Sequence, residues 1–255
     1  MDDVLFARGG AGCVDLPSGA RVQLPLRYLD WTGMMAHFPA SAAAIRKLLP
    51  SPKLKPVLAW PGTAILSVAA LEYRRLADVR PYNEVAIMTP VLYEPALNIP
   101  AAPLLFPKLF KGFGLFVLHM PVTTQESLEL GVQVWGYPKF LADIRFEEEG
   151  NLRRCRVRAD GKDVLTLGVK QAPGQIRNVD FRMLTVKDGK LLPHLIETEG
   201  LYGLWGFPGG ASLSFGDHPV GRELQSLGVG KTALARVFAS NVRSLLHEAV
   251  TELAI

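Results

Sequence analysis

The stretch LADIRFEEEGNLRRCRVRADGKDVLTLGV, residues 141–169, decides the fold class. Apolar and polar residues alternate through it in three runs, 141–147, 152–159 and 163–169, which is the period of half-buried strands. The runs are separated by Glu149-Gly150-Asn151 and by Asp160-Gly161, and Asp-Gly between alternating runs is a strong hairpin signal. The stretch therefore predicts an antiparallel meander.

Further strands and helices are expected around this meander. Strand-like composition and turn signals predict extended segments at 56–75 with a turn at Pro61-Gly62, at 84–92 and 113–119, and a hairpin at Lys187-Asp188-Gly189. Helices are expected at 40–49, which Pro50 ends, and from Thr123, which has capping-box spacing to Glu126, to about residue 134. Apolar residues at helical spacing predict a long helix over 232–255.

Strands in runs with helices at the margins predict an α+β fold. We expect a single domain over residues 1–255, with an antiparallel, curled or barrel-like sheet, peripheral helices and the long C-terminal helix. The chain has 255 residues, of which 49% are hydrophobic, so it can bury a sizeable core.

The composition argues against several classes of protein. The net charge of +4 is too small for the dense basic stripe of a nucleic-acid-binding protein. Cys13 and Cys155 are too few for a disulfide scaffold, and no zinc-ligand spacing is present. The acidic start Met-Asp-Asp is atypical of a signal peptide, and no apolar run reaches the length of a membrane span. We therefore expect a cytoplasmic protein with no metal, membrane or nucleic-acid partner.

Three other patterns carry less weight. Gly230-Lys231-Thr232 resembles the end of a phosphate-binding loop, but Gln225 stands where the first glycine is required, so a loop with Thr232 as N-cap is the simpler interpretation. His218, in a turn-like segment, has no assigned role. One strand face carries arginines that we expect to pair with acidic residues of the neighbouring strand: Arg154, Arg156 and Arg158 facing Glu147, Glu148 and Glu149.

Lys139 differs from the other lysines in its surroundings. It lies in Trp135-Gly136-Tyr137-Pro138-Lys139-Phe140-Leu141, among aromatic and apolar residues, and residues 131–142 contain no acidic side chain. Burial in an apolar pocket disfavours the ammonium form of a lysine and so enlarges the fraction of nucleophilic free amine. The alternative is a lysine whose stem packs on Trp135 while its amine reaches water.

A resemblance to a known family favours the first interpretation. The segment GVQVWGYPKFLAD, residues 131–143, resembles the signature of the acetoacetate decarboxylase family, in which the lysine after the proline forms a Schiff base with the substrate. The segment 81–87 resembles the family's upstream Tyr-x-Glu stretch, and 45–50 and 215–219 resemble its early helix and its late Phe-Asp-His segment. The resemblance covers nearly the whole chain. It implies that Lys139 is the nucleophile and that Glu84 is the active-site carboxylate.

The chain also departs from the family pattern. Phe140 replaces the second lysine of the pair, Gly131-Val132-Gln133 replaces Gly-Arg-Glu, no arginine stands near Phe38-Pro39, and a further family glutamate is missing near Ala69. Without a cationic neighbour at position 140, desolvation must activate Lys139. We expect the substrate to contact side chains that flank the two catalytic residues, namely Tyr82, Trp135, Tyr137, Phe140 and Gln133.

The resemblance implies a carbon–carbon lyase that decarboxylates acetoacetate or a bulkier β-keto acid through a lysine iminium, with no cofactor and in a homo-oligomer. Glu84 would transfer protons or orient the iminium. Two alternatives stay open: an aldolase-dehydratase that joins pyruvate to an aldehyde through the same lysine, and a protein that only binds a keto acid or an apolar ligand. If the Lys139 amine were exposed to bulk solvent, or kept ionised by a carboxylate, we would no longer expect Schiff-base chemistry.

Overall fold

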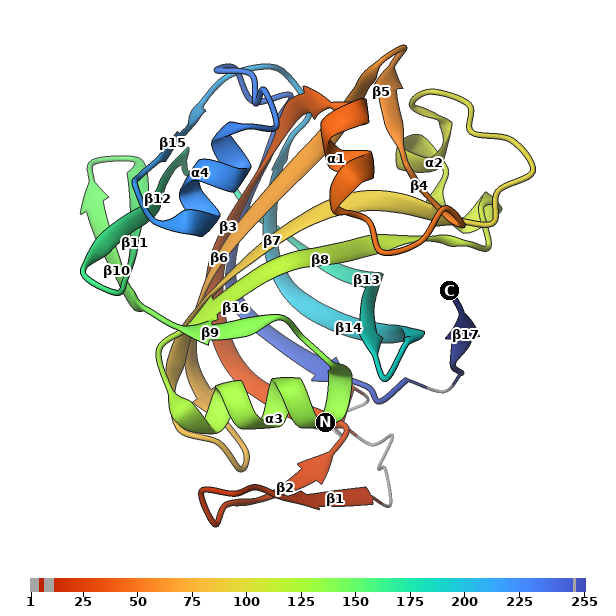
Figure 1. The fold of residues 1–255 in the computed structure, drawn as a ribbon. Coiled ribbons are helices and arrows are strands. Elements are labelled where there is room, and N and C mark those ends of the chain that lie inside the picture. Colours follow the sequence, from red (N-terminus) through yellow and green to blue (C-terminus); the bar gives the residue numbers. More distant parts are fainter. Residues whose placement is uncertain (1–4, 7–11, 250) are drawn as a thin grey trace.

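Seven long strands close into a barrel in the computed structural model, which describes residues 5, 6, 12–249 and 251–255 (Figure 1). Neighbouring strands around the barrel are β7 (Tyr82–Tyr93), β6 (Thr63–Leu76), β3 (Leu26–Ser41), β16 (Ala235–Leu246), β14 (Lys190–Trp205), β13 (Gln175–Lys187) and β8 (Phe113–Val122). A pairing of β8 with β7 completes the ring. Closure removes the unpaired sheet edges that an open sheet would expose. The expected barrel-like sheet is confirmed, and its pairings around the ring are antiparallel as expected except for that of β13 with β8, which is parallel.

Side chains alternate between the inside and the outside of the barrel, as they must along a strand. On β7, Tyr82, Glu84 and Ala86 point to the interior, whereas Val85 and Ile87 belong to a separate apolar core outside the barrel. Both faces of the strand are therefore buried. This arrangement keeps the interior free for a site, because the outer core supplies much of the packing.

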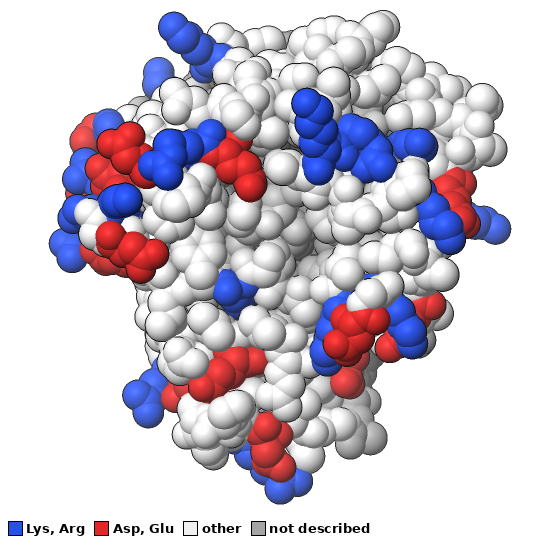
Figure 2. Space-filling model, in the orientation of Figure 1, with Lys and Arg blue, Asp and Glu red and all other residues white. Residues whose placement is uncertain are grey.

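A second sheet covers the outside of the barrel. It contains β10 (Asp143–Glu149), β11 (Leu152–Ala159), β12 (Lys162–Lys170) and β15 (Ala211–Phe215), paired antiparallel in that order. The predicted meander and its turns are confirmed. Figure 2 shows acidic and basic side chains intermingled over β10 and β11, and Arg154 pairs with Glu149 at 2.8 Å. The expected pairing with the β10 glutamates is thus confirmed for Arg154, whereas Arg158 pairs with Asp163 of β12 at 3.1 Å and Arg156 lies opposite Arg145.

Short elements surround these two sheets. The helices are α1 (Ala42–Leu48), α2 (Ala102–Leu105), the 3-10 turn η1 (Pro107–Leu109), α3 (Gln125–Trp135) and α4 (Pro219–Gln225). The small strands are β1 (Gly12–Asp15), β2 (Arg21–Leu24), β4 (Leu54–Pro56), β5 (Leu58–Trp60), β9 (Lys139–Leu141) and β17 (Leu253–Ala254). Strands account for 58% of the fold, so it is more strand-rich than the expected α+β class. Within the described residues, no helix combines the length and the apolar character that a membrane crossing requires.

The predicted long C-terminal helix is wrong. Residues 235–246 form β16, the chain then ends in β17, and Thr232 lies in the loop before β16 rather than at a helix start. A bulge explains the error, because the register of β16 against β3 shifts between Ala239 and Val242. The extra residue breaks the two-residue period, so inward-facing side chains recur at a spacing that imitates a helix.

The helix expected from Thr123 is present as α3, but its cap is the next residue. The Thr124 side chain accepts a hydrogen bond from the backbone N–H of Ser127 at 3.3 Å. Thr123 instead accepts one from the N–H of Asn83 at 2.9 Å, which ties the end of β8 to β7. The predicted capping box is therefore displaced by one position. The helix still lies across one end of the barrel (Figure 1), where it delivers the following segment to the interior.

Candidate active site

The loop after α3 carries Lys139 into the barrel. Gly136 ends the helix with a positive φ of 63°, a left-handed conformation that suits glycine. Tyr137 and Pro138 follow, and β9 then pairs in parallel with β8, with Lys139 opposite Met120. Because the first residue of β9 faces inward, the Lys139 side chain enters the space between α3 and the barrel strands, and it is 4% exposed.

The Lys139 amine has two oxygen partners. Its Nζ lies 2.9 Å from Glu84 Oε2 and donates a hydrogen bond to the backbone carbonyl of Ser127 at 3.1 Å. The rings of Tyr82 and Tyr137 flank the amine, with centroids 5.5 Å and 5.6 Å from Nζ. The amine is therefore enclosed, as the sequence predicts, but its enclosure includes a carboxylate from a strand distant in sequence.

The polar side chains around Glu84 other than Lys139 are phenols. Tyr73 donates a hydrogen bond from its hydroxyl to Glu84 Oε1 at 3.4 Å, and the hydroxyls of Tyr28 and Tyr82 lie 3.1 Å apart. Burial raises the pKa of Tyr73 well above its usual value, and the negative charge of Glu84 raises it further. The pKa of Tyr28 is raised by the same two causes. These phenols therefore stay neutral and serve as hydrogen-bond donors.

The Lys139–Glu84 contact allows an amine and a carboxylate to share a proton. An ammonium donates to both Glu84 and Ser127, whereas a neutral amine accepts a proton from a carboxylic acid and still donates to Ser127. The same geometry therefore serves both positions of the shared proton. Removal of either partner would leave a buried charge without its counterion, which is costly in a low-dielectric interior.

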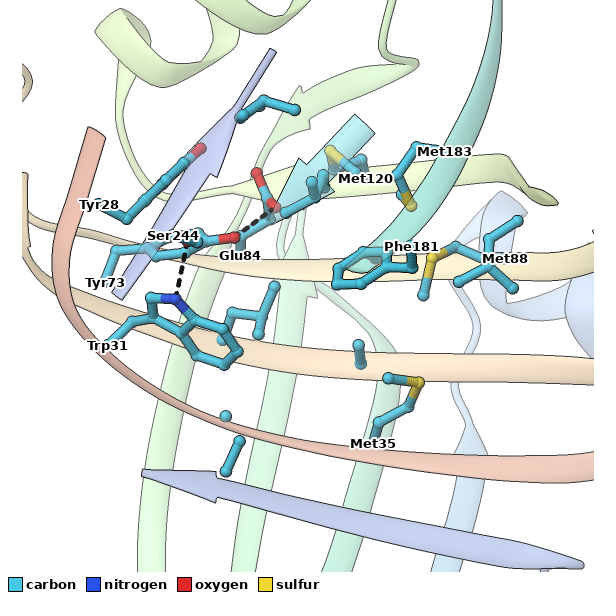
Figure 3. Close-up of a pocket in the computed structure, with 18 of the residues that line it drawn as sticks. Tyr28, Trp31, Met35, Tyr73, Glu84, Met88, Met120, Phe181, Met183 and Ser244 are labelled. Atoms are coloured by element: carbon cyan, nitrogen blue, oxygen red, sulfur yellow. Dashed lines mark hydrogen bonds between the residues drawn. The ribbon is translucent and has the colours of Figure 1, made fainter. Parts of the chain in front are cut away.

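A cavity of about 200 Å³ adjoins the pair inside the barrel. Figure 3 shows Glu84, Tyr73, Tyr28 and Trp31 on one side of it and Met88, Phe181 and Met183 on the other. Trp31 donates its indole N–H to Ser244 at 3.0 Å, so this polar group of the wall has a partner. Among the described residues that line the cavity, the charged ones are Lys139 and Glu84. The remaining lining is mostly apolar.

The structure brings together five of the seven residues that the sequence analysis places in the site. Tyr82, Trp135 and Tyr137 line the cavity with Lys139 and Glu84. Phe140 and Gln133 do not line it, and their expected substrate contacts are not supported. Phe140 follows Lys139 on a strand, so it points to the opposite face, where its ring stacks on His218. Gln133 lies on the exposed face of α3, and its amide donates to the Asp15 carbonyl.

His218 has a structural role outside the cavity. Its side chain caps α4 by accepting a hydrogen bond from the backbone N–H of Val220 at 3.3 Å. The site also contains Tyr28, Tyr73 and Ser127, which the sequence did not predict. Tyr73 lies in a segment predicted to be extended. The register of β6 on β7 pairs it with Tyr82, and from there its hydroxyl reaches the diagonal neighbour Glu84. Ser127 contributes its backbone carbonyl, which no side-chain pattern could indicate.

Gly131 on α3 gives the Lys139 stem its room. A Cβ at this position would lie 2.5 Å from Lys139 Cε and 2.6 Å from Cδ. We expect Gly131→Ala to displace the amine and lower kcat by about 100-fold, since an error of about 1 Å at a reacting group has that effect. The free energy of unfolding should change little, because alanine gains up to about 1 kcal/mol in helix propensity.

The matched control for this helix is Val132→Ala, because Val132 is the next residue and is 43% exposed. Activity assays and denaturant unfolding of both variants test the expectation. Unchanged kcat in Gly131→Ala would show that the amine tolerates displacement.

His194 supports Tyr137 from behind. Its Nε2 accepts a hydrogen bond from the Tyr137 hydroxyl at 2.6 Å, and its Nδ1 lies 3.3 Å from the Leu192 carbonyl. Burial lowers the pKa of His194 to about 4. The unfolded chain therefore takes up a proton between about pH 6.5 and pH 4 that the folded protein does not. Stability is present above this window and falls as the pH drops through it, by about 3 kcal/mol at 1.36 kcal/mol per pH unit.

We expect His194→Gln to reduce this part of the pH dependence, since glutamine can make similar hydrogen bonds without titrating. The rest comes from His37, because burial lowers its pKa to about 4 as well. Urea unfolding of both proteins at intervals from pH 7.5 to pH 4 measures the difference. Parallel pH profiles would contradict the assignment.

Comparison with known proteins identifies the family of the chain. A model of the acetoacetate decarboxylase (ADC) family matches residues 15–252. The chain belongs to the acetoacetate decarboxylase family. The family membership that the resemblance implies is therefore confirmed. The comparison with curated proteins gave no match.

Solved structures of acetoacetate decarboxylases and related enzymes share the fold. An acetoacetate decarboxylase from Legionella pneumophila subsp. pneumophila str. Philadelphia 1 is 16% identical, with a TM-score of 0.64 over 98% of this chain and 95% of that chain. The enduracididine biosynthesis enzyme MppR, complexed with pyruvate, is 18% identical, with a TM-score of 0.58 over 93% and 96%. An acetoacetate decarboxylase-like enzyme from Sphingomonas wittichii RW1 is 15% identical, with a TM-score of 0.53 over 90% and 93%. At these identities the likeness establishes the common fold.

Proposed function

We propose that this acetoacetate decarboxylase-family protein is a lyase that decarboxylates a β-keto acid through a Schiff base on Lys139. The observation that carries the proposal is a lysine amine, 4% exposed, in contact with a carboxylate at 2.9 Å inside a barrel. The enclosure excludes bulk water from the amine, and the neighbouring carboxylate can take the proton that the amine must lose before it attacks a carbonyl carbon. Schiff-base catalysis needs both.

The first half of the reaction forms the iminium. Glu84 takes the proton of Lys139, and the free amine attacks the ketone carbon of the substrate to give a carbinolamine. Protonated Glu84 then donates to the carbinolamine hydroxyl, which leaves as water. The product is a cationic iminium beside the Glu84 carboxylate, so the two charges of the resting pair are restored.

The second half breaks the carbon–carbon bond. The bond to the carboxylate carbon cleaves, carbon dioxide leaves, and the bonding electron pair moves through the iminium to give a neutral enamine. Protonation at carbon and hydrolysis of the resulting iminium release a ketone and free Lys139. Glu84 is within reach of the nitrogen throughout, and the neutral phenol of Tyr73 holds its other oxygen.

The charges in the cavity favour decarboxylation over condensation with pyruvate. The one cation that lines the described part of the cavity is Lys139, which is the nucleophile and is already paired with Glu84. A pyruvate carboxylate persists through turnover and would remain without a cationic partner in an apolar interior, which is costly. A β-keto acid loses its carboxylate as neutral carbon dioxide. The same apolar interior therefore destabilises the bound acid more than the transition state.

Product analysis by ¹³C NMR tests the proposal. The protein is incubated with acetoacetate or 3-oxohexanoate in one arm, and with pyruvate and an aromatic aldehyde in the other. Because β-keto acids also decarboxylate spontaneously, Lys139→Met serves as the background. We expect carbon dioxide and ketone above that background in the first arm. Condensation in the second arm without decarboxylation in the first would assign the aldolase-dehydratase reaction instead, and no turnover in either would leave a binding protein.

A further inference from the structure

Cross-strand register orders the barrel interior into levels. The first level is aromatic and consists of residues paired in turn across β7, β6 and β3: Tyr82, Tyr73 and Trp31. The second level contains Glu84 and its neighbours around the wall: Leu71, Gly33, Ala239 and Tyr202. The third level follows in the same way: Ala86, Ala69, Met35, Val237 and Leu204. Consecutive levels lie two residues, or about 7 Å, apart along a strand.

The chemistry of the wall changes after the second level. Every side chain of the third level is apolar, and Ala69 pairs directly with Ala86, which keeps that part of the cavity open. Met88 follows on β7, about 13 Å from Glu84 along the strand. Figure 3 shows Met88 with Phe181 and Met183 on the side of the cavity away from Tyr28 and Trp31. An apolar section therefore extends from the reacting groups.

The exposure of the lining indicates how a molecule enters. At the reacting level Tyr82 and Glu84 are each 5% exposed, whereas Leu204 in the third level is 53% exposed. Met35 and Val237 of the same level are half-buried. The cavity is thus closed around the reacting pair and open beside the apolar section. A substrate that enters here reaches Lys139 with its carbonyl group first and leaves its tail between apolar walls.

The volume is larger than a minimal substrate needs. An apolar protein cavity of about 150 Å³ accommodates benzene, and acetoacetate has only one non-hydrogen atom more than benzene. The cavity has about 200 Å³. Acetoacetate would leave its apolar section empty. Methionine side chains are flexible and can pack around tails of different shape.

We propose that the preferred substrate is a β-keto acid with an unbranched apolar tail that reaches from the Glu84 level past Ala69 and Ala86 towards Met88. This substrate class rests on the proposed function, because it requires the keto group at Lys139. Each methylene that enters the apolar section should raise kcat/KM about fourfold, which corresponds to about 0.8 kcal/mol per buried methylene. The rise should end once the tail reaches the open side near Leu204.

A chain-length series tests the inference. The rate of carbon dioxide release is measured for 3-oxobutanoate (acetoacetate), 3-oxopentanoate, 3-oxohexanoate and 3-oxooctanoate. The rate measured with Lys139→Met is subtracted from each as the spontaneous background. We expect kcat/KM to increase about 10-fold or more from the first to the third acid and then to level off. A series in which acetoacetate is best, or in which length has no effect, would overturn the inference and leave the decarboxylase proposal intact.

Two variants locate the tail. Ala86→Ile and Ala69→Val each add bulk to the third level, so they should abolish the preference for longer acids over acetoacetate. Val85→Ile is the matched control, since Val85 is a buried neighbour on β7 that faces the outer core. Thermal unfolding shows which of the two pocket variants fold, and the test requires only one folded variant. An unchanged length preference in a folded pocket variant would contradict the placement of the tail.

Binding of the neutral ketone products separates this inference from the proposed function. The dissociation constants of 2-propanone, 2-pentanone and 2-heptanone are measured by calorimetry, with Ala86→Ile for comparison. We expect affinity to rise with chain length in the wild-type protein and not in the variant. If no acid is decarboxylated but this trend is present, the proposed function fails and the apolar tail section stands. If the trend is absent, the tail section itself is refuted.

Discussion

Lys139→Met is expected to reduce kcat for β-keto acid decarboxylation by at least about 10⁴-fold, to the level of the spontaneous reaction. Methionine is unbranched and retains much of the packing of the lysine stem against Gly131, but it has no amine to attack a carbonyl carbon. The buried Glu84 loses its counterion and is expected to take up a proton rather than remain charged without a partner. Initial rates of carbon dioxide release measure the change.

The control for this substitution is Lys190→Met, which removes a lysine from a surface ion pair with Glu252. That pair is 56% and 55% exposed, and exposed pairs contribute little to stability. We expect unchanged kcat in the control. Residual activity in folded Lys139→Met within tenfold of wild type would show that another group performs the reaction.

Glu84→Gln is expected to lower kcat by about 10²- to 10⁴-fold, the usual contribution of a general acid–base group. Glutamine can still hydrogen-bond Lys139 and Tyr73, but it can neither accept the proton of the amine nor return one to the carbinolamine. The pH dependence of kcat should change as well, since the shared proton no longer has a second site. Rates from pH 5 to pH 9 test both expectations.

Glu72→Gln provides the matched control, because Glu72 also accepts hydrogen bonds from a buried cation but lies outside the cavity. Its Oε2 is 2.7 Å from Arg153, which is 4% exposed. We expect Glu72→Gln to lower the free energy of unfolding and to leave kcat near wild type. If Glu84→Gln behaves in the same way, Glu84 is a structural carboxylate and has no part in proton transfer.

Local signals predicted most of the strands. The hairpin at Asp160-Gly161 and the one at Asp188-Gly189 are set by turn chemistry and alternation, which are both visible within about ten residues. The prediction of a C-terminal helix was wrong for a reason that is not local. The bulge between Ala239 and Val242 exists because β16 pairs with β3 and β14, and it changes the spacing of the apolar residues. No periodicity within residues 232–255 separates that pattern from a helix.

The site residues also divide into those that a local signal could predict and those that depend on strand register. The loop that carries Lys139 could be predicted from its Gly and Pro residues and from its apolar surroundings, and the resemblance supplied Glu84. Phe140 was misassigned because the sequence does not show where β9 begins, and that start decides which of two adjacent residues faces inward. The pairing of β6 with β7 brings Tyr73 beside Glu84, and this contact depends on register alone. Side chains gathered from several strands are therefore the part that the sequence predicts least well.

Reductive trapping is the strongest test of a Schiff base on Lys139, because it detects the covalent bond itself. The protein is mixed with 3-oxohexanoate, reduced with borohydride, digested and analysed by mass spectrometry. We expect an alkylated peptide that carries the modification on Lys139, and we expect none without the keto acid or in Lys139→Met. A fully reduced sample in which Lys139 is unmodified, or is modified no more than surface lysines such as Lys190, would contradict the account.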